Sequence, residues 1–259
     1  IQPQPLAQNA AGEMALADIA GAIKPDDCHF ARPRLLCLEN TWNGNPMTTD
    51  YLARATALAR ERGLAVHLDG ARLFNAAVAT AAQGESVATA ARRIASHFDS
   101  VSVCFSKGLG APVGSALCGS KELIARAHRI RKMAGGGMRQ AGLLAAAATH
   151  ALNHHLERLA NDHALGQRLA LGLQGVQGLS VRSAQTNIVF VDVAEGRGAD
   201  LLAYLKQHGV LATGLIGLRF VTHLDVDAAG IDHTLHCIRR FFQEQAPGQT
   251  ASTSGAGVY

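Results

Sequence analysis

Residues 101–110 have the sequence Val-Ser-Val-Cys-Phe-Ser-Lys-Gly-Leu-Gly, in which an apolar strand runs into a lysine and a glycine-rich loop. Residues 66–72, Val-His-Leu-Asp-Gly-Ala-Arg, have a similar layout, with an aspartate and an arginine at the end of the strand. Around both segments, short apolar runs alternate with helical patterns from Arg34 to Asp192. This alternation predicts strands joined by helical crossovers, and therefore an α/β fold with a mainly parallel sheet covered on both faces.

The apolar periodicity and the turn residues predict the individual elements. Strands are expected over residues 35–38, 64–68, 101–105, 115–118, 188–191 and 218–221. Helices are expected from a Thr48 or Thr49 cap to Gly63, and over 86–98, 121–133, 138–173, 199–208 and 228–244. We therefore predict an incomplete large domain over 1–150, a smaller α+β domain over 151–245, and a disordered tail over 246–259, which is rich in glycine, serine and threonine.

Composition excludes several classes of function. The chain has 259 residues, of which 48% are hydrophobic, and its net charge of +4 comes from basic residues interspersed with acidic ones, so nucleic-acid binding is not indicated. The five cysteines are widely spaced and contain no Cys-x-x-Cys pair, which predicts buried free thiols in a reducing cytoplasm and no metal site. No apolar stretch is long enough to cross a bilayer, so no membrane association is expected. The chain begins at Ile1 without an initiator methionine or a signal peptide, so we expect its true N-terminus to be missing.

Asp69 and Lys107 are the first candidates for chemistry. Ligands of open α/β sheets bind beyond the carboxyl ends of the strands, where these two residues can meet although they are distant in sequence. A lysine can form a Schiff base with a cofactor aldehyde, and a carboxylate can keep a pyridine nitrogen protonated. Taken alone, an Asp-Gly after a strand is more often a turn, and Gly108, Gly110 and Gly114 could be ordinary turn residues.

Four strings make the pattern specific: Leu-Glu-Asn-Thr at 38–41, His-Leu-Asp-Gly-Ala-Arg at 67–72, Ser-Lys-Gly-Leu-Gly-Ala-Pro-Val-Gly-Ser at 106–115 and Arg-Lys-Met-Ala-Gly-Gly-Gly-Met-Arg-Gln at 131–140. In this order they resemble the low-specificity L-threonine aldolases, pyridoxal 5'-phosphate enzymes of the aspartate aminotransferase fold type. The resemblance runs from about residue 1 to residue 242 and covers all but the opening quarter of the family's chain. It implies a large domain of the PLP-dependent transferase type that lacks its N-terminal part, followed by the smaller domain.

The resemblance also assigns roles. Lys107 would hold the cofactor through an imine, Asp69 would pair with its ring nitrogen, and Arg72 would lie near its phenolic oxygen. Arg219 would bind the substrate carboxylate, because a planar two-pronged donor suits that group. Ser106 could donate to the cofactor phosphate, although it could equally end a strand.

Three further residues are candidates by resemblance. Lys132 and Arg139 flank the glycine triplet and belong to a region that reaches the site, across a subunit boundary, with Lys132 touching substrate and Arg139 the cofactor. His29 resembles a histidine on the side of the substrate hydroxyl and is the candidate base. His67 is assigned to the core, and Trp42 stands where a smaller or polar residue is expected.

The implied activity is cleavage of L-threonine or L-allo-threonine to glycine and an aldehyde by a cytoplasmic homotetramer. By resemblance the family's phosphate cradle belongs to the part before Ile1, so the chain alone is expected to bind cofactor poorly, and an inactive fragment is one of the alternatives. The alternatives are another enzyme of the same fold type, such as a serine hydroxymethyltransferase, an aminotransferase or a β-lyase, or a truncated subunit without catalysis.

Overall fold

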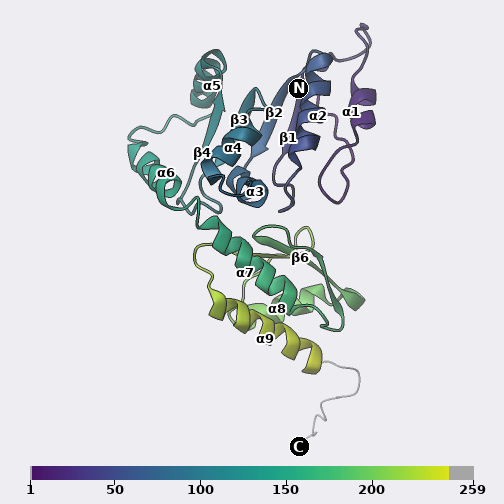
Figure 1. The fold of residues 1–259 in the computed structure, drawn as a ribbon, viewed down its shortest axis with the longest axis vertical. Coiled ribbons are helices and arrows are strands. Elements are labelled where there is room, and N and C mark those ends of the chain that lie inside the picture. The colour runs from purple at the N-terminus through teal and green to yellow at the C-terminus, as the bar shows by residue number, and fades with distance from the viewer. Residues whose placement is uncertain (1, 245–259) are drawn as a thin grey trace, which may run out of the picture.

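The computed structural model describes residues 2–244, and the predicted tail over 246–259 lies outside the described residues. Figure 1 shows two units along the long axis, one built on the strands β1 to β4 and the other on the strands β5 to β7. No helix within residues 2–244 is both long enough and apolar enough to cross a membrane. The α/β fold with a mainly parallel first sheet and a second sheet of different type is confirmed.

The first sheet has the strand order β1-β2-β3-β4. Its strands are β1 (Leu35–Glu39), β2 (Ala65–Gly70), β3 (Ser100–Cys104) and β4 (Ser115–Gly119). The first three strands are parallel, whereas β4 is antiparallel to β3 because a loop without a helical crossover joins them. The register places Glu39 beside Asp69, and Asp69 beside Ser102, so these three positions form one row across the sheet.

Helices cover one face of this sheet. The helices of the first unit are α1 (Leu16–Ala22), α2 (Thr49–Glu61), α3 (Leu73–Thr80) and α4 (Val87–Ala95). Two further helices, α5 (Lys121–Met133) and α6 (Gly142–His154), lie on the β4 side (Figure 1). The helix α2 begins where Thr48 Oγ1 accepts a hydrogen bond from Tyr51 N at 3.2 Å, and it buries Leu52, Ala55 and Ala59. The core lies between the helices α1 to α4 and the alternate strand residues Leu36, Leu38, Val66, Leu68, Val101 and Val103.

The opposite face of the sheet is the main departure from the expected fold. Leu35 is 52% exposed, and Cys37 and Asp69 on neighbouring positions of the same face are also exposed. Coverage on both faces was therefore wrong for the part of the chain that the structure describes. The cysteines follow the same pattern: all five are free, as expected, but only Cys237 is buried.

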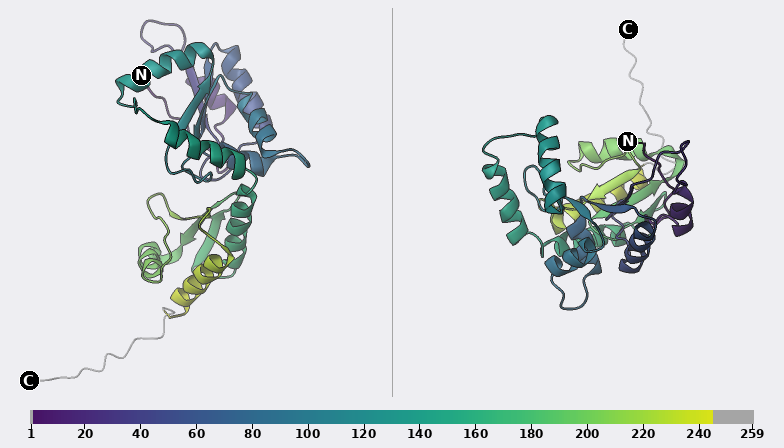
Figure 2. Two further views of the ribbon diagram at one scale, coloured as in Figure 1. Left: turned by 90° about the vertical axis from the view of Figure 1, so that its left-hand side faces the viewer. Right: turned by 90° about the horizontal axis from the view of Figure 1, so that it is seen from above.

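The second sheet is antiparallel and has the order β5-β6-β7. It consists of β5 (Leu179–Ser183), β6 (Ile188–Val193) and β7 (Leu218–Val221), with α7 (Leu159–Gly172), α8 (Gly198–Gln207), α9 (Ala228–Glu244) and a short 3-10 turn, η1 (Ala194–Gly196). The helices α7 and α9 run side by side on it (Figures 1 and 2), around a core that includes Leu169, Val189 and Ile238.

One long helix was expected over residues 138–173, but the chain forms α6 and α7 with a break between them. At this break His155 Nδ1 lies 2.6 Å from the backbone oxygen of Leu109. The predicted division at residue 150 falls inside α6, and the core of the second unit begins with residues of α7. The division between the domains stays a prediction.

Candidate active site

Lys107 lies on the tight loop that joins β3 to β4. The loop is closed by hydrogen bonds from Phe105 N to Gly114 O at 2.9 Å and from Gly110 N to Lys107 O at 2.9 Å. Gly110 and Gly114 have φ angles of +71° and +115°, which residues with a side chain rarely adopt. The loop therefore holds the exposed Lys107 just beyond the carboxyl end of β3.

Asp69 and Glu39 lie side by side at the carboxyl ends of β2 and β1. Asp69 is exposed, and its Oδ1 accepts a hydrogen bond from Ala71 N at 3.0 Å. Burial raises the pKa of the Glu39 carboxyl, and the negative charge of Asp69 raises it further. The positive charges of Arg72 and Lys107 act on this pKa in the opposite direction. Four charged groups from three segments of the chain therefore lie within electrostatic reach of one another.

A second arginine, Arg219 from the second sheet, completes this group. Arg72 directly precedes α3, and its pKa is lowered first by burial and then by the like charge of Arg219 on β7. The charges of Glu39 and Asp69 oppose this shift. Arg219 Nε is buried and has no hydrogen-bond partner among the described residues. We call Glu39, Asp69, Arg72, Lys107 and Arg219 the charged cluster.

Other predicted site residues lie beside the cluster or apart from it. Ser106 is exposed, and its Oγ is 3.4 Å from Cys104 Sγ. Lys132 and Arg139 are exposed at the end of α5 and beyond the glycine triplet, and no contact described in the structure joins them to Lys107. Their predicted roles stay predictions.

His29 lies on the loop between α1 and β1, which Figure 1 shows at the top of the view, at the opposite end of the sheet from α7. Its side chain is 83% exposed, and its Nδ1 is 2.7 Å from Asp27 Oδ1. Asp27, Cys28 and His29 bring three potential metal-ligand atoms within 4.8 Å, but all three residues are exposed and adjacent in the chain. The geometry of the described residues does not bring His29 to the charged cluster, and its catalytic role stays a prediction.

His67 and Trp42 were singled out in the sequence without a role in the site. The core assignment of His67 was wrong, because the side chain is half-buried on the same open face of the sheet as Asp69, where its Nδ1 lies 2.8 Å from Ser100 Oγ on the neighbouring strand. Trp42 stands in the turn after β1 and covers Gly12, where an added Cβ would come within 2.5 Å of Trp42 Cβ. Trp42 thus has a packing function that accounts for its size.

Sequence reasoning missed Glu39 as a member of the site. The sequence did contain a signal for Glu39, because it directly follows the predicted strand over 35–38, as Asp69 directly follows the predicted strand over 64–68. Sequence reasoning also missed Asn75 and His163, which form a partly buried hydrogen bond close to the backbone that follows Lys107. No local pattern distinguishes these two polar residues from ordinary residues of a helix.

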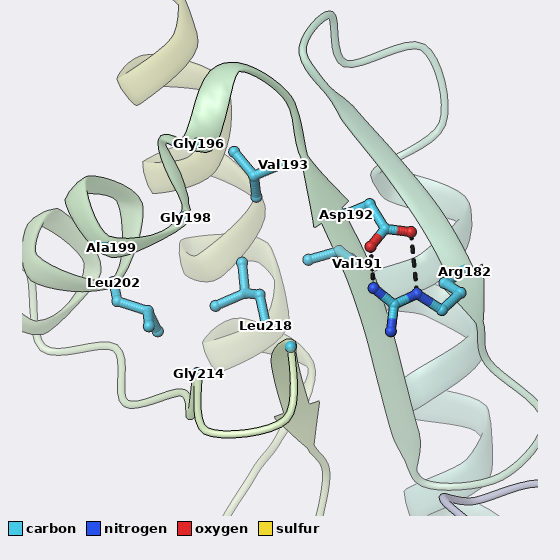
Figure 3. A pocket seen from close by; sticks show the side chains of 11 residues that line it. Arg182, Val191, Asp192, Val193, Gly196, Gly198, Ala199, Leu202, Gly214 and Leu218 are labelled. Carbon is cyan, nitrogen blue, oxygen red and sulfur yellow. Dashed lines mark hydrogen bonds and ion pairs between the residues drawn. The ribbon is translucent and has the colours of Figure 1, made fainter.

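A pocket of about 360 Å³ lies in the C-terminal unit, between β6, the start of α8 and the loop before β7 (Figure 3). Its charged lining is the ion pair of Arg182 and Asp192, in which Arg182 Nε donates to Asp192 Oδ2 at 3.0 Å. This pairing lowers the pKa of Asp192, so both charges are already matched. None of the predicted site residues lines this pocket.

Comparisons with known proteins identify the family of this chain. The profile of the family described as beta-eliminating lyase matches residues 1–196. The chain is 47% identical over 226 residues to the low specificity L-threonine aldolase of Escherichia coli K12, a match that covers 87% of this chain and 66% of the relative. It is 35% identical over 263 residues to low-specificity L-threonine aldolase 1 of Arabidopsis thaliana, covering 96% of this chain and 72% of the relative.

Solved structures show the same fold. A threonine aldolase of Leishmania major superposes with a TM-score of 0.73 at 22% identity, over 91% of this chain and 69% of the other. The chain spans about two thirds of the length of the curated relatives it matches. The family match over residues 1–196, together with these two relatives, shows that the chain belongs to the beta-eliminating lyase family, in which its relatives include low-specificity L-threonine aldolases.

Proposed function

We propose that this chain forms a pyridoxal 5'-phosphate-dependent aldolase that cleaves L-threonine or L-allo-threonine to glycine and an aldehyde. The observation that carries the proposal is the charged cluster. The loop after β3, the carboxyl ends of β1 and β2, and the strand β7 of the second sheet all contribute to it. The names of the relatives from Escherichia coli and Arabidopsis thaliana support the choice of threonine as substrate.

The residues present fit the cofactor. Lys107 is an exposed amine beyond a strand end, where it can reach an aldehyde, and Asp69 is an exposed carboxylate on the neighbouring strand. Gly110 and Gly114 shape the loop so that its backbone can lie close to a bulky ligand. When bound, pyridoxal phosphate supplies an electron sink for cleavage of the Cα–Cβ bond. We assign Lys107, Asp69, Arg72, Ser106 and, across a subunit boundary, Arg139 to holding it.

The chain's own residues would then bind and orient the amino acid. Arg219 has an unpartnered buried Nε, so its guanidinium is short of an acceptor that a substrate carboxylate can provide. Asp69 would hold the proton on the ring nitrogen, while the raised pKa of Glu39 limits the negative charge beside it. The amine of Lys107, once released by the substrate, can move a proton at the reacting carbon.

Assembly and location are part of the proposal. We propose a homo-oligomer, a tetramer by family resemblance, in which Lys132 contacts substrate across a subunit boundary. Apolar side chains exposed on and around α5 and α6 support such contacts: Ile130 at 60%, Met133 at 85%, Met138 at 64% and Leu143 at 79%. The five free cysteines support a reducing compartment, and we propose the cytoplasm.

The test has two steps, with Lys107→Ala as the variant and Lys121→Ala, at an exposed position on α5, as the matched control. The protein is incubated with excess pyridoxal phosphate and reduced with borohydride, and the modified lysine is located by mass spectrometry. We expect Lys107 to be modified in the wild type and in the control. Modification spread over exposed lysines, or unchanged in Lys107→Ala, would reject the cofactor assignment.

The second step measures acetaldehyde released from L-threonine and L-allo-threonine without folate or a keto acid. With pyridoxal phosphate in excess, which offsets the weak cofactor binding expected of this chain, we expect release by the wild type and the Lys121→Ala control, and none by Lys107→Ala. Release that requires folate or a keto acid would favour another enzyme of this fold type. Labelling of Lys107 without any release would favour a subunit that binds cofactor but does not catalyse.

A further inference from the structure

A buried polar junction joins the two units directly behind Lys107. It consists of Asn75 on α3, His163 on α7 and Asn187 just before β6, and the two asparagines are only 3% and 2% exposed. Asn75 Nδ2 lies 3.1 Å from His163 Nε2 and donates to Asn187 Oδ1 at 3.2 Å. Asn187 Nδ2 in turn donates to Thr222 O at 2.9 Å. We call Asn75, His163 and Asn187 the amide-histidine junction.

The hydrogen bonds fix the protonation of the junction. Because Asn187 Nδ2 donates to Thr222 O, its Oδ1 faces Asn75 and must accept from the Asn75 amide. The second N–H of that amide points to His163 Nε2, which must therefore be an acceptor. His163 is then neutral, with its proton on Nδ1. Burial lowers the pKa of His163 to about 4, in agreement with a neutral ring.

The junction also touches the segments that hold the charged cluster. A Cβ added at Gly108 would come within 3.1 Å of Asn75 Oδ1, so the backbone that follows Lys107 lies directly against the junction. Thr222 follows the strand of Arg219, and its backbone N donates to Asn187 O at 2.9 Å. Asn75 lies one turn into the helix that Arg72 precedes.

We propose that the amide-histidine junction is a positioning unit that sets the spacing between the Lys107 amine and the Arg219 guanidinium. These two groups come from different sheets, and the junction ties together the backbone beside each of them. An amino acid whose carboxylate is bound by Arg219 then presents its amino end to Lys107 at the correct distance. The inference rests on the proposed function, because the spacing matters only for a ligand that both groups contact.

The amide-histidine junction could instead only stabilise the packing of the two units, without any effect on ligand binding. The experiment separates this stabilising role from the positioning role. His163→Phe keeps a ring but removes the acceptor, which leaves an Asn75 N–H buried without a partner. His163→Gln presents a side-chain oxygen near the position of Nε2 and restores the acceptor. Leu169→Ala, in the core of the second unit on the same helix, is the control for loss of stability alone.

Three quantities are measured for each protein: borohydride labelling at Lys107, the glycine concentration that half-saturates the change in the cofactor absorbance, and the urea midpoint. We expect His163→Phe to retain labelling but to need far more glycine, with kcat/KM for threonine lower by a factor on the order of 100, as for a displacement of about 1 Å. We expect His163→Gln to recover most of both values, and Leu169→Ala to lower the urea midpoint while its half-saturation stays near that of the wild type.

Equal glycine half-saturation in His163→Phe and the wild type would overturn the inference, as would an equal loss in His163→Gln or in Leu169→Ala. If His163→Phe does not fold, Asn75→Ala removes the same hydrogen bond by truncation and is measured in its place. Failure of the proposed function has a different signature, because the wild type itself would then lack labelling at Lys107. In that case the half-saturation of the wild type could not be observed, and the positioning role would be rejected with it.

Discussion

The stability of this protein should fall on mild acidification because of one histidine. Burial lowers the pKa of His163 from 6.5 to about 4 in the folded chain. Between these two values the unfolded chain binds a proton that the folded chain does not, so the free energy of unfolding decreases as the pH falls through this window. The contribution is fully present above the unfolded pKa of 6.5 and is lost as the pH approaches about 4.

The expected loss in the free energy of unfolding follows from the shift in the pKa of His163. At about 1.4 kcal/mol for each pKa unit, the upper bound is about 3.5 kcal/mol, and we expect about 2 kcal/mol because the ring is only partly buried. The assay is urea unfolding at a series of pH values between about 7 and about 4.5, for the wild type and for His163→Gln. Glutamine does not titrate, so the difference between the two proteins isolates His163.

The other titrating groups are common to both proteins. His97 also has a lowered pKa, from burial and from Arg60 and Arg93, and contributes a slope of the same sign. The pKa of Asp192 is lowered by Arg182, so its contribution is lost at lower pH than that of a histidine. The reasoning about the junction is refuted if the wild type and His163→Gln lose stability in parallel over this range, or if acid stabilises the wild type relative to the variant.

Three further substitutions test the site and its surroundings. Gly70→Ala should destabilise the fold by about 1–3 kcal/mol in urea unfolding, because the new Cβ would lie 2.7 Å from the backbone oxygen of Ser102, and an unchanged midpoint would contradict this contact. Arg219→Lys should raise KM for the amino acid on the order of tenfold, since the charge remains but the two-pronged donor is lost, whereas an unchanged KM would exclude Arg219 from carboxylate binding. His29→Asn should retain near-normal kcat if the exposed loop keeps that side chain apart from the charged cluster, whereas a large loss would confirm its predicted role as base.

Local patterns in the sequence predict six of the seven strands within the described residues, but they miss the strand β5 and the helices α1 and α3. The strands β3 and β7 and the helices α5 and α9 lie at or within one residue of the predicted ranges, because each has a clear apolar period and a glycine, serine or alanine at its boundary. The helix α3 was not predicted. Its sequence, Leu-Phe-Asn-Ala-Ala-Val-Ala-Thr, is apolar on most sides, so it has no polar face from which a helical period can be read.

The break between α6 and α7 also has no local signal. Residues 155–158, His-Leu-Glu-Arg, contain neither glycine nor proline, and isolated helix propensity would continue through them. The chain turns there in a tertiary setting, where His155 contacts the backbone of Leu109 and Arg158 pairs with the buried Asp162. A break of this kind depends on partners more than 40 positions away or on the buried environment, which a local window does not contain.

The candidate site, too, could be predicted from the sequence only in part. The meeting of Asp69 and Lys107 could be expected, because parallel strands that follow one another place their carboxyl ends at one edge of a sheet. The position of Arg219 could be anticipated only by family resemblance, since it depends on how the second sheet docks on the first. That docking is held by the amide-histidine junction, in which a shift of one unit against the other would leave several buried polar groups unpaired. An apolar contact would tolerate such a slide at little cost, whereas each unpaired buried group costs about 1–3 kcal/mol. Directional polar contacts at this boundary therefore fix the distance between Lys107 and Arg219 more tightly than hydrophobic packing could.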